Sequence, residues 1–93
     1  MPSARVNPAI VQGLARYLRE HPFASDTTDG IARWWLPGSG TPPAADVEAA
    51  LQWLVAQGLV LRVVAPDGRV RYRRDGAADD AAWQDRLHQL PSC

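Results

Sequence analysis

The chain has 93 residues, no net charge at neutral pH and 46% hydrophobic residues. This length suits one domain with one core, and four tryptophans supply enough apolar surface for folding without disulfide bonds. The chain has a single cysteine, which excludes a protein stapled by disulfide bonds. It has no apolar run near the roughly 20 residues that cross a bilayer, which excludes a membrane-spanning protein. Because it also has no signal-peptide pattern, we expect cytoplasmic localisation.

Charge is segregated along the chain, and all the basic residues are arginines because lysine is absent. The charged residues of segment 1–19 are all basic, and those of segment 20–50 are mainly acidic. Residues 61–74 are strongly basic, and residues 75–93 are acidic again. Since arginine binds phosphate better than lysine does, the basic segment is a candidate contact for a polyanion.

The first half of the chain predicts two helices. Asn7 is a typical N-cap and Pro8 suits the first helical position, so we expect a helix that ends near Glu20. Asp26 is expected to cap a second, shorter helix, which ends at the Pro-Gly-Ser-Gly turn of residues 37–40. Glycine destabilises the interior of a helix, and a close approach between two helices would explain its presence at position 30.

The third helix is the clearest element of the sequence. Thr41 is the expected cap, with two prolines in the first turn, and an apolar stripe runs along one side of the helix. Gly58 suits a left-handed residue that closes the helix, and Leu59 would then contact Leu54 in a Schellman ending.

A β-hairpin and a last helix follow. Strands are expected at about 59–65 and 69–74, joined by an Ala-Pro-Asp-Gly turn. If Ala65 opposes Gly68, four arginines share the outer face, whereas a bulge at Gly68 would shift the pairing by one residue and mix the faces. The amphipathic pattern favours the first register. Residues 78–90 predict a final helix.

Two stretches resemble the bacterial winged helix-turn-helix family. Residues 26–36, DTTDGIARWWL, are similar to the first helix of the helix-turn-helix pair. Residues 42–60, PPAADVEAALQWLVAQGLV, are similar to the second helix and its Gly-Leu-Val exit into the wing. The resemblance covers roughly residues 8–74 and identifies a fold more than an activity.

The resemblance implies an α+β, mainly α winged helix with a three-helix core, a two-stranded β-hairpin wing and an additional C-terminal helix. The whole chain, 1–93, would then be a single domain. Family members lay the second helix of the pair in the major groove of double-stranded DNA and place the wing on the DNA backbone. The first functional hypothesis is therefore a DNA-binding, regulator-like module. Its expected contact residues are Arg62, Arg69, Arg71, Arg73, Arg74 and Gln52.

The exposed side of the third helix departs from this pattern. Asp46 and Glu48 stand where phosphates would approach, although acids in the first turns also stabilise a helix. Gln52 is the one side chain suited to reading a base edge. The hairpin arginines also have two structural explanations: they keep a strand edge soluble, or they pair with the acids that follow.

A second apolar stripe on the third helix supports the other hypothesis, an adaptor or homodimerising module. The stripe would be covered by the C-terminal helix of the same chain, by a second copy or by a protein partner. The expected protein-contact residues are Ala45, Ala49, Trp53, Ala56, Trp83, Leu87 and Leu90.

Enzymatic and metal functions lack a signature. No phosphate loop, dinucleotide fingerprint or nucleophile motif is present, so no catalytic residue and no cofactor is expected. His21, His88 and Cys93 match no common zinc spacing. The chain is also short for an effector pocket, and none is expected.

Overall fold

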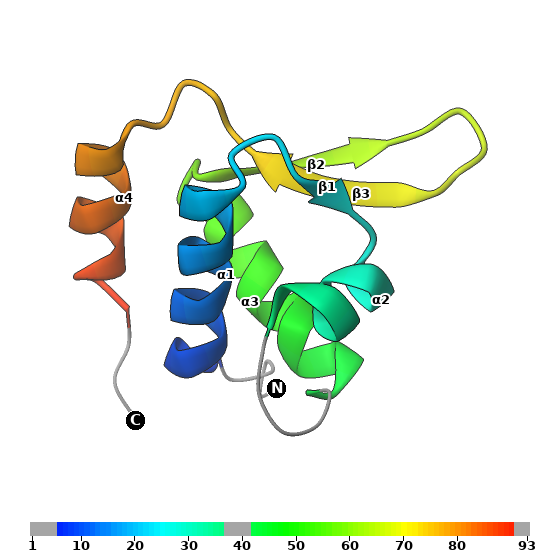
Figure 1. Ribbon diagram of the computed structural model, residues 1–93, viewed down its shortest axis with the longest axis horizontal. Coiled ribbons are helices and arrows are strands. Elements are labelled where there is room, and N and C mark those ends of the chain that lie inside the picture. Colours follow the sequence, from blue (N-terminus) through cyan, green and yellow to red (C-terminus); the bar gives the residue numbers. More distant parts are fainter. Residues whose placement is uncertain (1–5, 37–41, 91–93) are drawn as a thin grey trace.

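The computed structural model describes residues 6–36 and 42–90, which form an α+β fold with a three-stranded antiparallel sheet along one side of the helices (Figure 1). The hairpin of the sheet projects well beyond the helices. The elements in chain order are α1 (Pro8–Glu20), β1 (Ser25–Asp26), α2 (Thr28–Gly30), the π-helical turn η1 (Ile31–Trp35), α3 (Ala44–Ala56), β2 (Val60–Val64), β3 (Val70–Arg74) and α4 (Asp80–Leu87).

Helix α1 is as the sequence predicts. The Asn7 side chain accepts a hydrogen bond from the Ala9 amide at 2.9 Å, and Pro8 occupies the first helical position. The apolar face of α1 is buried against α3 and η1, which places α1 at the centre of the molecule. The N-cap, the proline and the apolar stripe all predict the same helix, so local sequence signals are sufficient to place it.

The second helical segment differs from the prediction. Asp26 is not its cap: it lies in the short strand β1, and the Thr27 hydroxyl accepts the hydrogen bond from the Gly30 amide at 3.2 Å. Only Thr28–Gly30 is α-helical before the backbone widens into η1. Because β1 pairs with β3, the sheet has three strands instead of the two expected.

The reason for Gly30 also differs. A methyl group at this position would overlap the carboxylate of Asp26, so the residue that needs the space is Asp26 and not a neighbouring helix. That carboxylate also accepts a hydrogen bond from the Thr27 amide at 2.8 Å, which restricts its movement. Gly30, the last residue of α2, therefore leaves the space in which the Asp26 carboxylate folds back over the turn between β1 and α2.

Gly30→Ala is expected to lower the free energy of unfolding by about 1 kcal/mol, the reverse of the usual gain when alanine replaces a helical glycine. Gly76→Ala is the matched control, since Gly76 lies in open space and its φ is not positive. We expect the control to be neutral or to gain about 0.5 kcal/mol. Urea denaturation measures both, and a stabilised Gly30→Ala variant would contradict this account of the turn.

Helix α3 begins at Ala44 with Pro43 as its N-cap, so the two prolines precede the helix and are not in its first turn. The expected cap Thr41 lies outside the described residues. The end of α3 is as predicted: Gly58 has φ +77°, its amide donates to Val55 O, and the Leu59 amide donates to Leu54 O, each at 3.0 Å. These two bonds form a Schellman motif that directs the chain into β2.

The hairpin adopts the bulged register. Val64 opposes Val70, Val63 opposes Arg71 and Arg62 opposes Tyr72, so the favoured pairing of Ala65 with Gly68 is wrong. Gly68 has φ +87° and donates to Ala65 O, which closes a turn whose left-handed last residue adds one residue to the loop. As a result, each face of the hairpin carries both arginine and apolar side chains.

The core lies between α1, α3 and the sheet. Its fully buried side chains come mainly from the two long helices, and Tyr72 is the buried residue of β3. Trp35 is also buried and stacks on Tyr17, with ring centroids 4.7 Å apart. Trp34, its neighbour in η1, is 73% exposed, so one tryptophan of the pair lies in the core and the other on the surface.

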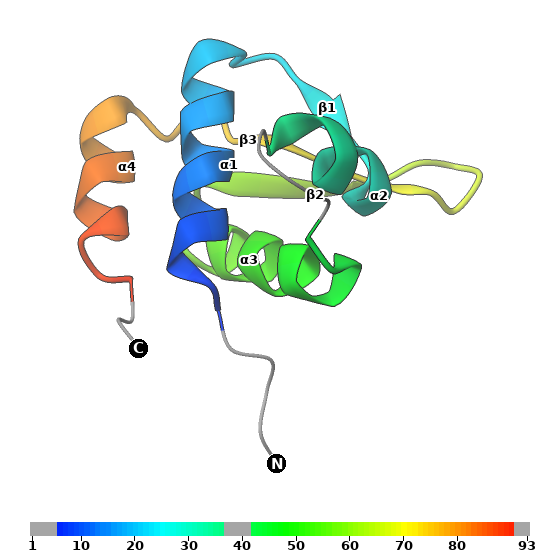
Figure 2. The same cartoon turned by 60° about the horizontal axis from the view of Figure 1, so that its bottom comes forward.

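Helix α4 is shorter than the predicted 78–90 and lies beside α1, at the opposite end of the molecule from the hairpin tip (Figures 1 and 2). Trp83 is its buried anchor, while Leu87 and the following Leu90 are half-buried against the core. The outer stripe of α3 is not covered by this helix, since Ala45 and Ala56 remain exposed.

Candidate nucleic-acid interface

An arginine row, defined as Arg69, Arg71 and Arg73, lies along the projecting hairpin. Arg71 and Arg73 are exposed on the face of β3 opposite Tyr72, because successive side chains of a strand alternate between faces. Arg69, one residue before β3, is also exposed. At the 3.3 Å rise of a strand, alternate residues are about 7 Å apart, so the three guanidinium groups are spread along the length of the hairpin.

The row has apolar neighbours on β2. Val63 opposes Arg71 and Leu61 opposes Arg73, so these side chains share the face of the arginine row. Val63 is 41% exposed, and the apolar stems of the arginines can lie along it while the guanidinium groups stay in water. Ser25 of β1 opposes Arg73 on the other side and adds a hydroxyl group to the same face.

Arg62 does not belong to this face. It opposes Tyr72 and therefore lies on the face of the sheet that turns toward the helices, although its side chain is exposed. The predicted grouping of Arg62 with Arg69, Arg71 and Arg73 is wrong because the bulge at Gly68 shifts the register by one residue. The hairpin consequently carries positive charge on both faces.

The hairpin arginines differ in their partners. Within the described part of the chain, Arg62, Arg71 and Arg73 form no ion pair. Arg69 lies 3.7 Å from Asp67 in the turn, where both side chains are well exposed. An exposed pair of this kind contributes little and is readily exchanged for another anion. Four guanidinium groups are thus available to a ligand.

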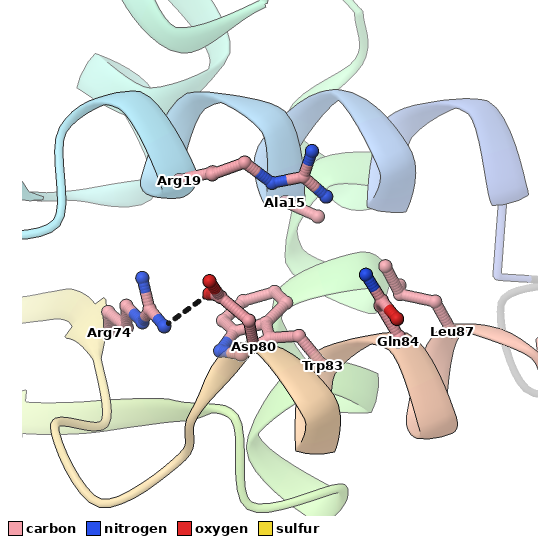
Figure 3. Close-up of a pocket in the computed structure, with 7 residues that line it drawn as sticks. All are labelled: Ala15, Arg19, Arg74, Asp80, Trp83, Gln84 and Leu87. Atoms are coloured by element: carbon pink, nitrogen blue, oxygen red, sulfur yellow. Dashed lines mark hydrogen bonds and ion pairs between the residues drawn. The ribbon is translucent and has the colours of Figure 1, made fainter.

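Arg74 has a different environment. Its side chain is 17% exposed, and its Nη2 lies 3.2 Å from both the carbonyl oxygen of Ala78 and the carboxylate of Asp80 (Figure 3). The guanidinium carbon also lies 5.7 Å from the centre of the Trp83 ring. These contacts connect β3 to α4, so Arg74 is occupied within the fold, and its predicted role in binding nucleic acid stays a prediction.

The acids that follow the hairpin lie at its α4 end. Asp80 pairs with Arg74, and Asp79 caps α4 through the Ala82 amide at 2.9 Å. Asp79 also shares a surface hollow with Arg73. Since α4 and the hairpin tip are at opposite ends of the molecule in both views, the acids of α4 lie away from the tip.

The exposed side of α3 offers few groups that read DNA. Gln52 is exposed, but its amide donates to the Glu48 carboxylate at 3.3 Å, and Asp46 is half-buried in the first turn. The helix contains no basic residue. A base contact by Gln52 would require exchange of its bond to Glu48, and the two acids would repel nearby phosphates.

The second apolar stripe of α3 is partly open. Ala45 and Ala56 are exposed, whereas Ala49 and Trp53 are half-buried, and Trp53 packs against the core. Trp53 thus has both a structural contact and an accessible portion. Trp83 and Leu87, predicted to join this stripe, instead pack beside α1, so the predicted protein-contact residues do not form one surface.

Residues 6–36 and 42–90 contain neither a cluster of metal ligands nor a helix suited to cross a membrane. No cluster of three or more His, Cys, Asp or Glu side chains there has the arrangement of a metal site. His21 packs at a tilt against Tyr17 with ring centroids 4.5 Å apart, and His88 is the C-cap residue of α4. Nor does any helix in these ranges have the length and apolarity needed to span a bilayer.

Sequence reasoning missed β1 and with it Ser25, the neighbour of Arg73. A two-residue strand has no periodicity of its own, and Asp26 followed by Thr27 fits the start of a helix equally well.

No protein-family model, curated protein or solved structure matches this chain. Assignment of a function therefore depends on the geometry of the hairpin and of α3.

Proposed function

We propose that this chain is a winged-helix, non-enzymatic module that binds double-stranded DNA through backbone phosphates. The order of elements supports the winged-helix assignment, because α3 closes at Gly58 and leads directly into the hairpin, as the family resemblance implies. The hairpin is the wing, and β1 extends its sheet on the far side of β3.

The observation that carries the proposal is the set of available guanidinium groups on a projecting hairpin. Arg62, Arg69, Arg71 and Arg73 are exposed and carry positive charge on both faces. A net-neutral chain that concentrates arginine in this way has a local positive potential suited to a polyanion. Guanidinium groups also bind phosphate oxygens in a bidentate manner.

The predicted mode of binding is independent of base sequence. Phosphate contacts position a protein on a duplex, whereas specificity requires contacts with base edges. Because α3 has no basic side chain and its Gln52 is hydrogen-bonded to Glu48, we expect this helix to recognise base edges weakly. We therefore expect similar affinities for unrelated duplexes and a strong dependence on salt.

Fluorescence anisotropy with labelled duplexes of unrelated sequence tests the proposal. Titrations between about 20 and 200 mM salt, a range over which phosphate contacts weaken markedly, give both the affinity and its salt slope. The expected result is binding at low salt that weakens steeply as salt rises. Absence of binding to any duplex at the lowest salt would refute the proposal.

A second candidate function, protein contact through α3, is favoured by the accessible portion of Trp53 beside the exposed Ala45 and Ala56. Trp53→Phe and Trp53→Ala are the informative pair, because Trp53 also packs against the core. If α3 is a contact surface, the alanine variant should lower self-association or partner affinity by about 2 kcal/mol, the usual effect of losing a buried interface tryptophan.

Sedimentation velocity over a range of protein concentrations measures this effect, with circular dichroism as a check on folding. The phenylalanine variant retains most of the apolar area and should associate more strongly than the alanine variant. A folded Trp53→Ala protein with the same sedimentation and the same partner capture as the wild type would exclude the contact role.

A further inference from the structure

A cavity of about 160 Å³ lies between α1 and α4, on the opposite side of the molecule from the hairpin tip (Figure 3). Arg19 and Ala15 line it from α1, and Asp80, Gln84 and Leu87 line it from α4. Since one water molecule occupies about 30 Å³ in the liquid, the space has room for a group of phosphate or carboxylate size.

The polar groups around this cavity are mainly hydrogen-bond donors. The Arg19 guanidinium extends over Ala15 and faces Gln84 across the gap. Arg19 has no ion-pair or hydrogen-bond partner for its side chain among the residues that the structure describes. The Gln84 side chain, exposed on α4, likewise has an amide free to donate in the described structure.

One carboxylate also lines the cavity, and its charge is already offset. The Asp80 carboxylate lies 3.2 Å from the Arg74 guanidinium, which also lines the site. Arg19 is then the uncompensated charge, so the lining as a whole carries one net positive charge. A lining of this kind attracts a small anion, whereas Asp80 on its own would repel one.

We infer that this cavity binds a small oxyanion, a phosphate or a carboxylate group, held by the Arg19 guanidinium from one helix and the Gln84 amide from the other. The anion would connect α1 to α4 where the two helices share few polar contacts. Ligands that bind only the folded arrangement stabilise it, so occupancy should hold α4 more firmly against α1. This inference is independent of the proposed DNA-binding function and involves none of the four hairpin arginines.

The test is a titration of the full chain with inorganic phosphate, observed by NMR through the Gln84 side-chain amide and the Trp83 indole N–H. Chloride is exchanged for phosphate at constant ionic strength, so that screening does not change. Saturable shifts at these two groups are expected. A parallel titration with acetate separates the two sources of oxyanion: tighter binding of phosphate assigns a phosphate site, and tighter binding of acetate assigns a carboxylate site.

Arg19→Gln should weaken binding roughly tenfold or more, because it removes a charged hydrogen-bond donor. Arg16→Gln is the matched control: Arg16 is exposed on the same helix, and the change in charge is identical, but Arg16 does not line this cavity. Gln84→Ala should weaken binding by a smaller factor. Both arginines are exposed, so neither change is expected to unfold the chain.

Linear, non-saturable shifts in the wild type would overturn the inference, and so would equal weakening by Arg19→Gln and Arg16→Gln. The melting temperature gives a second readout. At constant ionic strength, phosphate should raise it for the wild type and for Arg16→Gln but not for Arg19→Gln. A rise of the same size in all three proteins would show a general effect of the salt and would also overturn the inference.

Discussion

Replacement of the arginine row, Arg69, Arg71 and Arg73, by alanine is expected to weaken binding to every duplex by about tenfold or more at low salt. The reason is the loss of three phosphate contacts, each of which adds about 0.9 to the slope of log affinity against log salt. The slope should therefore fall by about 2.7. Fluorescence anisotropy across a salt series measures both quantities with the same duplexes.

The matched control replaces three exposed arginines outside the hairpin, Arg16, Arg33 and Arg86, by alanine. The net charge of the two triple variants is the same, so a difference between them reports the position of the charges. The control should keep most of its affinity and nearly the wild-type slope. Equal losses in both variants would mean that net charge, not the wing, determines binding.

Arg62 gives a finer test of the observed register. The bulge at Gly68 places Arg62 on the face opposite the arginine row. The phosphate backbone of one DNA strand therefore cannot contact Arg62 and the arginine row from the same side of the hairpin. If the arginine row alone follows the backbone, adding the Arg62 change to the triple variant should alter the salt slope little. If the wing inserts between two backbones, the slope should fall by about another 0.9.

Trp83→Ala is expected to lower the free energy of unfolding by about 3–5 kcal/mol, the usual effect of removing a large aromatic side chain from a core. Trp83 is 6% exposed and is the buried residue of α4. The ring also supports the Arg74 guanidinium, so its loss frees that arginine from one of its contacts. For a small domain this change is a large part of the total stability.

Trp83→Phe is the informative partner of that variant. The Trp83 indole nitrogen is buried without a hydrogen-bond partner in the described structure, and an unsatisfied buried donor costs about 1–3 kcal/mol. Phenylalanine removes the donor and retains much of the ring, so the gain should offset most of the lost apolar contact. The expected change in the free energy of unfolding is within about 1 kcal/mol of zero.

Urea denaturation followed by circular dichroism measures both Trp83 variants, and hydrogen exchange of the α4 amides shows whether the helix detaches locally. A phenylalanine variant as unstable as the alanine variant would mean that the indole nitrogen has a hydrogen-bond partner. That result would also weaken the view that α4 is held mainly by an aromatic ring and an arginine.

The sequence by itself determined the elements whose signals are local. The Asn7 cap with Pro8 predicts the start of α1, and Gly58 predicts the end of α3, because each signal acts within one helical turn. The apolar stripe of α3 also predicts its buried side. The concentration of arginine on the hairpin is a property of the sequence alone.

The tertiary structure decided what depends on contacts between distant segments. Strand β1 exists because Ser25 and Asp26 pair with β3, although the two strands are far apart in the sequence and β1 is too short to show a pattern. The position of α4 beside α1, instead of over α3, follows from the fit of Trp83 and Arg74, which no periodicity encodes. The sequence is compatible with two hairpin registers, because the Ala-Pro-Asp-Gly turn can form in both. In the structure, Gly68 is left-handed and adds a bulge, which gives the register that separates Arg62 from the arginine row.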